Sequence, residues 1–381
     1  MTDVNQALED ANVREMIEKM KVINRRQNED RISISMIGTG GGLSGQGWRN
    51  NNALVEHGDA VIMIDIGMTN ADIAQNIKPA HIIITHMHPD HVGGLARHLL
   101  WCKYVAKMRP TIYVPSSFIV EMFGPHGEKL WDTNMLWDNY LAVQLEDGSA
   151  PDGSPVKLTF EDFADVVVCP VRIGLKEQVS FCTQKIDAGN GFTHAVTFEF
   201  YQIVQNAHHT PASPACGLII SNLCKRPPSW LIYTSDVRWH GGANITEGIA
   251  NGASMIFHDV QIMGAPSPAG VHAHIDELLA SDADLSRVVA MHHGFAPAMK
   301  YATLRDELLR LDAELSGKKT SRRSLYDDDA THAALVKVYA LIKRGGSIMC
   351  GDGNAFNLRA LHVEHMMIDD FGIAVNAPAK T

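Results

Sequence analysis

The sequence predicts an α/β protein in which two β-sheets are sandwiched between layers of helices. Two observations support this fold class. Short apolar strand patterns occur in both the front and the rear of the chain, and helical patterns flank them. A length of 381 residues accommodates one large domain or two ordinary ones. Since 45% of the residues are hydrophobic and 20% are charged, the composition also provides for a core.

The first part of the chain predicts a polar helical extension and then the first sheet. The expected elements are a helix over 1–30, strands over 31–38, 53–56 and 60–66, a short helix over 68–77, a strand over 81–84, a helix over 92–106 and a strand over 111–114. His57-Gly58-Asp59 joins two of these strands as a hairpin, and Thr69 or Asn70 is the N-cap of the short helix. The domain proper therefore spans residues 31–381.

The rear of the chain predicts a second group of strands and the C-terminal helices. Residues at about 120–200 are interpreted as an insertion that covers one edge and shapes the substrate pocket. The expected elements after it are strands over 197–204, 217–220, 230–233, 254–258 and 287–291, helices over 275–280, 301–316 and 329–343, and a strand pair around Gly351-Asp352-Gly353.

Charge and cysteine usage narrow the class of protein. The formal net charge is −10 at pH 7, which disfavours a long nucleic acid as partner because proteins that bind one usually carry a basic face. The six cysteines are scattered without a C-x-x-C pair, as is typical of reduced thiols in the cytoplasm. No apolar run is long enough to span a bilayer, and the acidic start MTDVNQALED does not resemble a signal peptide. A cytoplasmic protein with no membrane partner is expected.

The stretch IIITHMHPDHVGG, which begins at Ile82, places four ligand-type side chains within six residues directly after a buried strand. Imidazole and carboxylate groups suit zinc, manganese or iron. His86 and His88 are two residues apart and can face one ion from an extended turn, while Asp90 and His91 can face a second ion. The sequence therefore predicts a two-metal site at the rim of a sheet.

Two ions need further ligands, which we expect directly after other apolar strand patterns. Segment IVQNAHHTP offers His208 or His209, LIYTSDVRW offers Asp236, and VVAMHHGF offers His292 or His293. A carboxylate can bridge two ions, which makes Asp236 the natural bridging ligand. Each residue alone would be interpreted as an ordinary surface histidine or turn aspartate, but four strand ends agree on one chemistry.

A glycine-rich segment next to the first strand resembles a dinucleotide-binding motif, but we reject this interpretation. GGGLSG at 40–45 matches the G-x-G-x-x-G pattern of dinucleotide-binding proteins, which requires a helix that begins inside the pattern. Here Trp48-Arg49-Asn50 leads to another predicted strand instead. The glycines are interpreted as a tight turn near the metal site, and no organic cofactor is predicted.

The combined motifs resemble those of the metallo-β-lactamase superfamily. THMHPDH is similar to its H-x-H-x-D-H motif, and the later His, Asp and His occur in the same order with similar spacing. GTGGG at 38–42, the asparagines at 50–52 and IDIG at 64–67 extend the resemblance over nearly the whole chain. The resemblance implies an αββα sandwich of two mixed β-sheets flanked by helices.

The resemblance also implies a role for each candidate ligand. The first ion would be bound by His86, His88 and one of His208 and His209, and the second by Asp90, His91 and one of His292 and His293. Asp236 would bridge the ions, and Asp65 would support the ligands without binding metal. In each doublet we favour the residue that comes first after its strand, His208 and His292. The expected cofactors are two divalent ions, zinc with manganese or iron as alternatives.

Three features favour the branch of the superfamily that is similar to ribonuclease Z and related phosphodiesterases. Val-Gly-Gly-Leu follows the D-H pair as it does there, FHDV resembles a histidine–acid pair of that branch, and VHAHIDELL resembles its H-x-T helix. The resemblance implies that His272, paired with Asp259, donates a proton to the leaving oxygen. His274 replaces the threonine and is a second candidate donor. Alternatively, both histidines are exposed residues at the start of a helix.

These residues together predict a metal-dependent phosphodiesterase. Two cations hold a bridging water and lower its pKa from about 15.7 to about 7, and attack by the resulting hydroxide expels an alkoxide that needs a proton. Asp90 therefore counts as both a ligand and a catalytic residue, and His272 or His274 would supply the proton. The expected substrate is a small phosphodiester such as a cyclic nucleotide, because the chain lacks the Gly/Pro-rich arm with which ribonuclease Z grips tRNA.

Other interpretations stay open at this point. One is an RNA endonuclease similar to ribonuclease Z, and another is a lactone, ester or thioester hydrolase that uses the same metal pair. A third is a binding or sensor protein on a scaffold that has lost its activity. A homodimer is a further expectation from the resemblance, since dimers are common in this branch.

Overall fold

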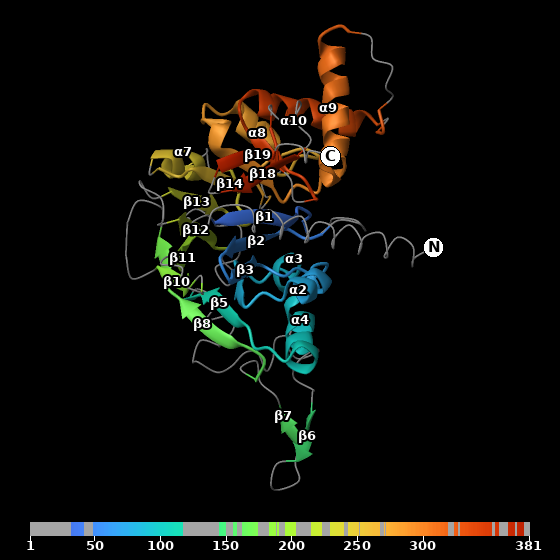
Figure 1. Ribbon diagram of the computed structural model, residues 1–381. Coiled ribbons are helices and arrows are strands. Elements are labelled where there is room, and N and C mark those ends of the chain that lie inside the picture. The colour runs from blue at the N-terminus through green and yellow to red at the C-terminus, as the bar shows by residue number, and fades with distance from the viewer. Residues whose placement is uncertain are drawn as a thin grey trace.

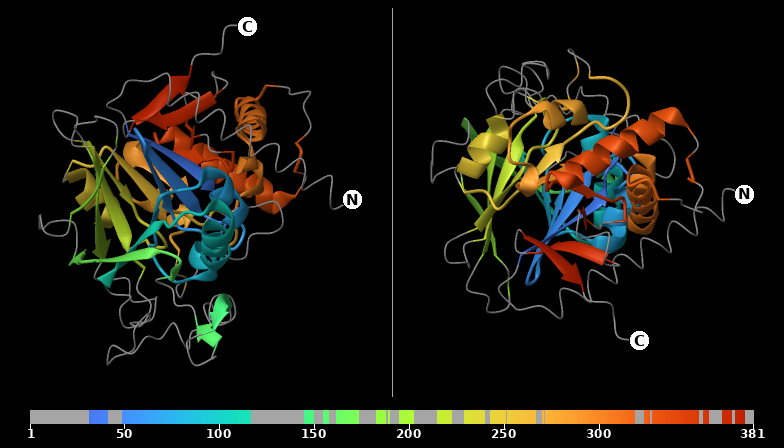
Figure 2. Two further views of the ribbon diagram at one scale, coloured as in Figure 1. Left: turned by 60° about the horizontal axis from the view of Figure 1, so that its bottom comes forward. Right: turned by 90° about the horizontal axis from the view of Figure 1, so that it is seen from above.

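Two β-sheets face each other between helices in this protein, as its computed structural model shows (Figures 1 and 2). The structure describes residues 32–41, 49–116, 145–149, 155–157, 162–173, 183–187, 189, 195–202, 215–222, 229–239, 243–250, 252–266, 270, 272–318, 324–326, 328–352, 355–357, 365–369 and 372–376. The predicted helix over 1–30 and the predicted ligands His208 and His209 lie outside these residues.

The first sheet has eight strands in the order β19-β18-β1-β2-β3-β4-β5-β8. They are β1 (Ser33–Gly38), β2 (Asn52–His57), β3 (Ala60–Ile64), β4 (His81–Ile83), β5 (Thr111–Pro115), β8 (Asp165–Cys169), β18 (His365–Asp369) and β19 (Gly372–Asn376). The strands expected before residue 115 are confirmed, whereas β8, β18 and β19 were not predicted. From β3 to β8 the strands run parallel, so their carboxyl ends share one edge.

The second sheet has the order β10-β11-β12-β13-β14-β15-β16-β17, with β9 paired to β11. Its strands are β9 (Val171–Ile173), β10 (Gln184–Asp187), β11 (Ala195–Gln202), β12 (Gly217–Asn222), β13 (Ser229–Tyr233), β14 (Met255–Asp259), β15 (Val288–Met291), β16 (Ser347–Met349) and β17 (Ala355–Phe356). All strands predicted from 197 onwards are present. Strands β13 to β16 run parallel, which again brings the carboxyl ends of several strands to one edge.

Helices cover the outer face of each sheet. The first sheet carries α2 (Ala71–Ile77), α3 (Pro89–Val92), α4 (Leu95–Trp101) and a π-helical turn η1 (Cys102–Ala106). The second carries α7 (Ala243–Ala250), α8 (Ile275–Ala280), α9 (Tyr301–Leu315) and α10 (Asp329–Lys343), with short 3₁₀ turns η6 (Leu285–Arg287) and η7 (Ala296–Met299). The helix predicted over 92–106 is thus three pieces, because the chain bends at Gly93-Gly94 and ends in a wider turn.

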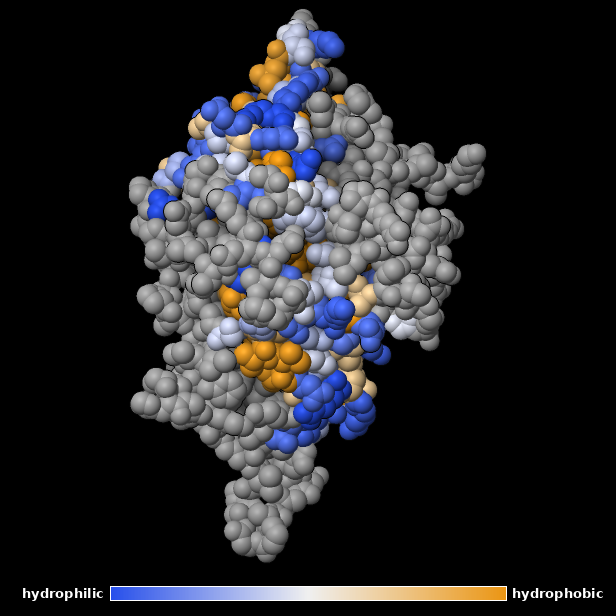
Figure 3. Space-filling model, turned by 90° about the vertical axis from the view of Figure 1, so that its left-hand side faces the viewer, coloured by the Kyte–Doolittle hydropathy of each residue, from blue (hydrophilic) through white to orange (hydrophobic). Residues whose placement is uncertain are grey.

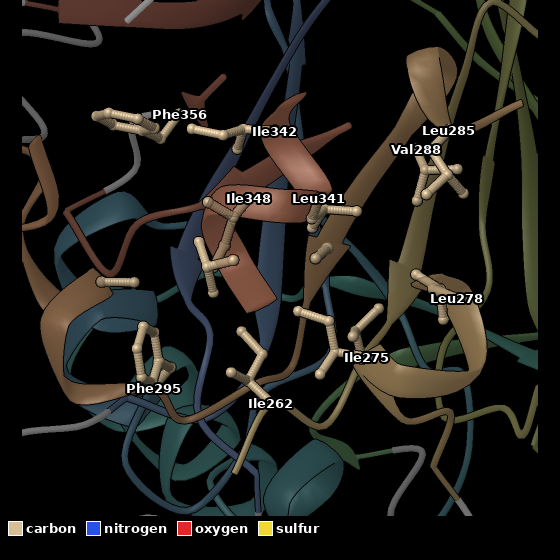
Figure 4. Packing of buried hydrophobic residues seen from close by; sticks show 14 of the residues in the cluster. Ile262, Ile275, Leu278, Leu285, Val288, Phe295, Leu341, Ile342, Ile348 and Phe356 are labelled. Atoms are coloured by element: carbon tan, nitrogen blue, oxygen red, sulfur yellow. The ribbon is translucent and has the colours of Figure 1, made fainter. Parts of the chain in front are cut away.

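Three apolar clusters correspond to the three interfaces between the layers. One fills the space between the sheets, one lies beneath α2 and α4, and the largest lies beneath α8, α9 and α10 (Figure 4). The isoleucine run shows how one strand serves two interfaces: Ile83 faces the other sheet, while Ile82 and Ile84 face the helices. Burial on both faces explains the unbroken apolar run, and the predicted αββα sandwich is confirmed.

The segment predicted as an insertion over about 120–200 contributes to both sheets in its described part. Strand β8 extends the first sheet, and β9, β10 and the start of β11 belong to the second. Only β6 (Leu145–Ser149) and β7 (Pro155–Lys157) form a separate two-stranded sheet, which lies away from the sandwich in Figure 1. The rear of this segment is therefore part of the fold itself.

The described surface carries few large hydrophobic side chains. None of its helices combines the length and the apolar character that a bilayer crossing requires. Large exposed hydrophobic side chains are few among the described residues, and hydrophobic colour in Figure 3 is limited to small areas among hydrophilic atoms. The large exposed hydrophobic side chains among the described residues are Met68, Tyr104, Val105, Val168, Met299, Leu315 and Leu325.

Candidate metal centre

Six predicted ligands meet where strand ends of the two sheets come together. Four follow β4 of the first sheet within one turn, and the other two follow β13 and β15 of the second sheet. We call them the histidine–aspartate cluster: His86, His88, Asp90, His91, Asp236 and His292. All are buried except His88, whose side chain is 40% exposed and so gives the cluster its contact with solvent.

Local sequence explains how the first four ligands are presented. Pro89 is the first residue of α3, where its missing N–H leaves no helical bond unmade, so Asp90 and His91 occupy the first turn of a helix. The N–H of Ile66 donates to the carbonyl of His91 at 2.7 Å and holds this turn against the end of β3. Gly67 permits the contact, since a Cβ at that position would lie 2.0 Å from the Asp90 carbonyl oxygen.

Asp236 lies at the centre of the cluster and divides it into two sides. Its Oδ2 is 3.5 Å from His86 Nε2 and 4.0 Å from His88 Nδ1. Its Oδ1 is 3.1 Å from His91 Nε2 and 3.4 Å from His292 Nε2. One carboxylate therefore faces a histidine pair with each oxygen, which is the arrangement expected of a ligand that bridges two ions.

Asp90 completes the second side. Its Oδ2 is 3.3 Å from His292 Nε2 and 3.7 Å from His91 Nε2. Asp90, His91, Asp236 and His292 thus offer four ligand atoms within 4.8 Å of one another, and His86, His88 and Asp236 offer three on the other side. Mixed imidazole and carboxylate sets of this size are typical of divalent transition-metal sites.

The pKa values of the cluster are shifted by burial and by neighbouring groups of opposite charge. Burial opposes ionisation of Asp236, but His292, His91 and His86 hold the pKa of its carboxyl well below the usual range. Burial also opposes the charge on His91, yet Asp236 and Asp65 raise its pKa to about 10. For His86 burial prevails and lowers the pKa to about 3, which leaves the ring neutral.

The polar atoms at the centre have the burial and the ligand chemistry that a bound cation needs. His91 Nε2 and Asp236 Oδ1 are fully buried and close together, yet neither makes a hydrogen bond within the described part of the chain. Buried polar atoms are satisfied in the great majority of proteins, and a metal ion between these two would satisfy both. The ligand chemistry of the cluster therefore makes it a candidate divalent metal site.

Asp259 and His272 lie beside the cluster, as a pair. His272 Nδ1 is 2.7 Å from Asp259 Oδ2, and the other oxygen of Asp259 is 3.4 Å from His292 Nδ1. The rings of His272 and His292 have their centres 4.9 Å apart. The Asp259 carboxylate raises the pKa of His272. Since the His272 side chain is 30% exposed, it can meet a substrate at the edge of the cluster.

His274 occupies a structural position at the start of α8. It is the N-cap of α8, where its Nδ1 accepts from the N–H of Asp276 and its own N–H donates to Glu277, so the two ends of a capping box are both made. Its Nε2 contacts the carbonyl of Gly264 at 3.2 Å. Both ring nitrogens are thereby occupied. The alternative of an exposed helix-start residue is wrong for His274 in one respect, because the residue is 1% exposed.

The structure also separates the two histidines of the last doublet. His292 belongs to the cluster, whereas His293 Nε2 contacts the carbonyl of Met349 at 2.7 Å and its Nδ1 accepts from the N–H of Phe295. Burial lowers the pKa of His293 to about 4, so the ring is a neutral structural group. Geometry thus favours His292, as expected from its place directly after the strand.

Two hydroxyl side chains that the sequence did not single out lie against the cluster. Thr85 and Ser235 each come directly before a ligand and are fully buried. Ser235, like Asp65 and His292, has a positive φ, at 55°, 63° and 59° respectively. Left-handed backbone at a non-glycine residue is costly and concentrates at functional sites. The available sequence signal was a hydroxyl residue directly before two of the predicted ligands, His86 and Asp236.

Comparison with known proteins identifies relatives over most of the chain. The family model of the anti-Pycsar protein Apyc1 matches residues 32–308. Curated proteins of that name are 27% identical over 267 residues in Paenibacillus xerothermodurans and 28% identical over 275 residues in Bacillus phage 010DV004. Each alignment covers 69% of this chain, and 87% and 89% of the respective relative.

Solved structures with a similar arrangement are more distant. Unliganded yeast PDE1 aligns at a TM-score of 0.46 with 12% identity, covering 84% of this chain and 97% of that one. The metallo-β-lactamase fold protein YhfI from Bacillus subtilis aligns at a TM-score of 0.43 with 14% identity, covering 69% of this chain and 87% of that one.

Proposed function

The chain belongs to the anti-Pycsar protein Apyc1 family and is a hydrolase of the metallo-β-lactamase fold, and from this premise we propose that it is a phosphodiesterase for small phosphodiesters such as cyclic nucleotides. The observation that carries the proposal is the histidine–carboxylate pair beside the candidate metal site, in which His272 Nδ1 lies 2.7 Å from Asp259 Oδ2. A thioester does not call for such a donor as strongly, because its thiolate leaves without a proton, whereas the ring opening of a cyclic nucleotide releases an alkoxide that has to be protonated.

We assign the two sides of the cluster to two divalent ions. His86 and His88 would hold one ion and Asp90, His91 and His292 the other, with Asp236 between them. His208 or His209 remains a proposed further ligand of the first ion. When bound, such ions act as Lewis acids that activate water and neutralise phosphate oxygens. Zinc is the proposed metal, with manganese or iron as alternatives that the same donor set accommodates.

His272 is proposed to protonate the leaving oxygen. An alkoxide is a poor leaving group unless it takes up a proton as the P–O bond breaks, and a positioned acid contributes about 10²–10⁴-fold to such a step. Asp259 raises the pKa of His272, which favours the protonated form of the donor, and fixes the ring through Nδ1. Its Nε2 would then carry the proton that the leaving group receives.

The experiment is a turnover assay with the metal-loaded protein. We would compare a 3′,5′-cyclic nucleotide, bis(p-nitrophenyl) phosphate, a precursor tRNA, a lactone and a thioester, each beside Asp90→Ala. Turnover of the cyclic nucleotide that disappears in the variant would support the proposal. Cleavage of the tRNA alone would identify an RNA endonuclease, and turnover restricted to the lactone or thioester would contradict the proposed phosphodiesterase. A light-scattering measurement on the same sample tests the proposed homodimer.

A further inference from the structure

Behind the histidine–aspartate cluster, a chain of buried hydrogen bonds connects its two sides. Asp65 Oδ2 is 2.7 Å from His91 Nδ1 and also accepts from Thr85 Oγ1 at 2.7 Å. Ser235 Oγ donates to Thr85 Oγ1 at 2.8 Å. His86 Nδ1 lies 3.2 Å from Thr85 Oγ1 and 3.3 Å from Ser235 Oγ. We call Thr85 and Ser235 the hydroxyl bridge.

Counting protons along this chain determines which nitrogen of His86 is protonated. An ionised carboxylate only accepts hydrogen bonds, and a hydroxyl group has a single proton to give. Thr85 uses its proton on Asp65, so it can only accept from Ser235. Ser235 uses its proton on Thr85. Both hydroxyl oxygens therefore face His86 Nδ1 as acceptors, and the favourable partner for them is an N–H.

We infer that Asp65 sets the ring tautomer of His86 through the hydroxyl bridge as well as that of His91 by direct contact. In each ring the proton is held on Nδ1, and the lone pair of Nε2 is left for a metal. These two Nε2 atoms face opposite oxygens of Asp236, His86 towards Oδ2 and His91 towards Oδ1. One carboxylate thus prepares one ligand nitrogen on each side of the cluster, and Thr85 and Ser235 are positioning residues.

The backbone around the bridge is organised to hold these groups in place. Asp65 and Ser235 both have left-handed φ values, and Thr85 bonds Asp65 a second time through its N–H to Oδ1 at 2.8 Å. The Thr85 carbonyl also accepts from the N–H of Cys216, at the start of β12 in the other sheet. Asp65, Thr85, Ser235 and both histidines have 0% exposure, so water does not compete for their hydrogen bonds.

The inference rests on the proposed metal site and extends it to residues that touch no metal or substrate. Partners that orient a metal-bound histidine typically change metal affinity by about 10–100-fold when removed. Thr85→Val keeps the shape of the side chain but removes the hydroxyl. Ser235 is then free to donate its proton to His86 Nδ1, which would disfavour the Nδ1–H tautomer. Thr85→Ser restores the hydroxyl and should restore the tautomer.

The test measures zinc affinity and stoichiometry by competition with a chromophoric chelator. Thr85→Val is expected to bind about 10–100-fold more weakly on the His86 side, with Ser235→Ala less affected and Thr85→Ser close to the native protein. Thr197→Val is the matched control, because it removes a buried hydroxyl in β11 that donates to the Ser221 carbonyl in β12, away from the cluster. Equal affinity in Thr85→Val and Thr197→Val would overturn the inference.

A second readout does not depend on any variant. Nitrogen NMR of the zinc-loaded native protein with labelled histidine should show His86 and His91 protonated at Nδ1. His88 approaches Asp236 through Nδ1, so it should be protonated at Nε2 and serve as an internal contrast. Protonation of His86 at Nε2 would overturn the inference. If the native protein takes up no divalent metal, the proposed metal site itself fails.

Discussion

The two sides of the candidate metal centre are built in different ways. On the first sheet, four ligands come from six consecutive residues after β4, and a single turn of α3 sets their relative positions. On the second sheet, Asp236 and His292 come from the ends of β13 and β15, and only the pairing of the strands brings them together. The comparison teaches that half of this site is local in sequence, while the other half depends on correct assembly of a sheet.

Asp236 is where the two halves meet, and its removal should have the largest effect. Asp236→Asn keeps the shape but replaces one ligand oxygen by a donor group that cannot bind metal. Loss of a metal ion removes several kcal/mol of transition-state stabilisation, so phosphodiester turnover should fall by about 10³-fold or more. The total metal content, measured by atomic spectrometry, should fall because both proposed ions share this ligand. Full retention of two ions would mean that the halves bind metal independently.

Substitution of His272 should slow the protonation of the leaving group and leave the metal site intact. His272→Gln is expected to lower kcat for a substrate with an alkoxide leaving group by about 10²–10³-fold. With a p-nitrophenolate leaving group, which departs without a proton, the loss should be below about tenfold. Metal content should equal that of the native protein, and Asp259→Asn should reproduce the pattern in part. An equal loss on both substrates would argue for a general structural defect.

His292 and His293 are adjacent but have different surroundings, so their substitutions test which of the two belongs to the metal centre. His293→Ala removes the contacts with the Met349 carbonyl and the Phe295 N–H, which should cost about 3 kcal/mol of unfolding free energy in denaturant titrations. Its metal stoichiometry should stay unchanged below the unfolding transition. His292→Ala should show the opposite pattern, with reduced metal content. If His293→Ala lost metal while His292→Ala kept it, our choice within the doublet would be wrong.

The smallest effect concerns His98 on α4, a buried histidine on the first-sheet side that takes no part in the cluster. Burial lowers its pKa from 6.5 to about 4, so the unfolded chain binds this proton more readily than the folded one. Above pH 6.5 the ring is neutral in both states and costs no stability. As the pH falls from 6.5 towards 4, the unfolded chain takes up the proton first, and the free energy of unfolding is lowered by about 2 kcal/mol at pH 5.

His98→Leu removes the titrating imidazole, and the leucine side chain occupies the buried space that it leaves. Unfolding in denaturant, with chelator present so that metal loss does not contribute, should show similar stability at pH 7.5 and greater stability of the variant at pH 5. Parallel loss of stability in both proteins between these pH values would contradict the assignment.

Most strands could be predicted from the sequence because their patterns are local. The run at 82–84 is apolar on both faces and is buried on both faces, and Ala53–Glu56 lies within β2 as expected. Strands β18 and β19 were missed, although β18 pairs with β1, because a pairing between Ser33 and Asp369 has no sequence signal that connects the two ends of the chain. For the same reason β8 was assigned to an insertion and not to the edge of the first sheet.

The chemistry of the site could be predicted from local sequence alone, because a contiguous histidine–aspartate motif after a buried strand indicates metal ligands whose spacing is fixed by one turn. The tertiary structure decided which side chains serve it. It directed His292 to the cluster and His293 to the Met349 carbonyl, and it made His274 a helix cap while His272 stayed at the edge. The physical reason is that the direction of a side chain follows from packing and from the hydrogen bonds offered by distant segments, and neither is encoded in neighbouring residues.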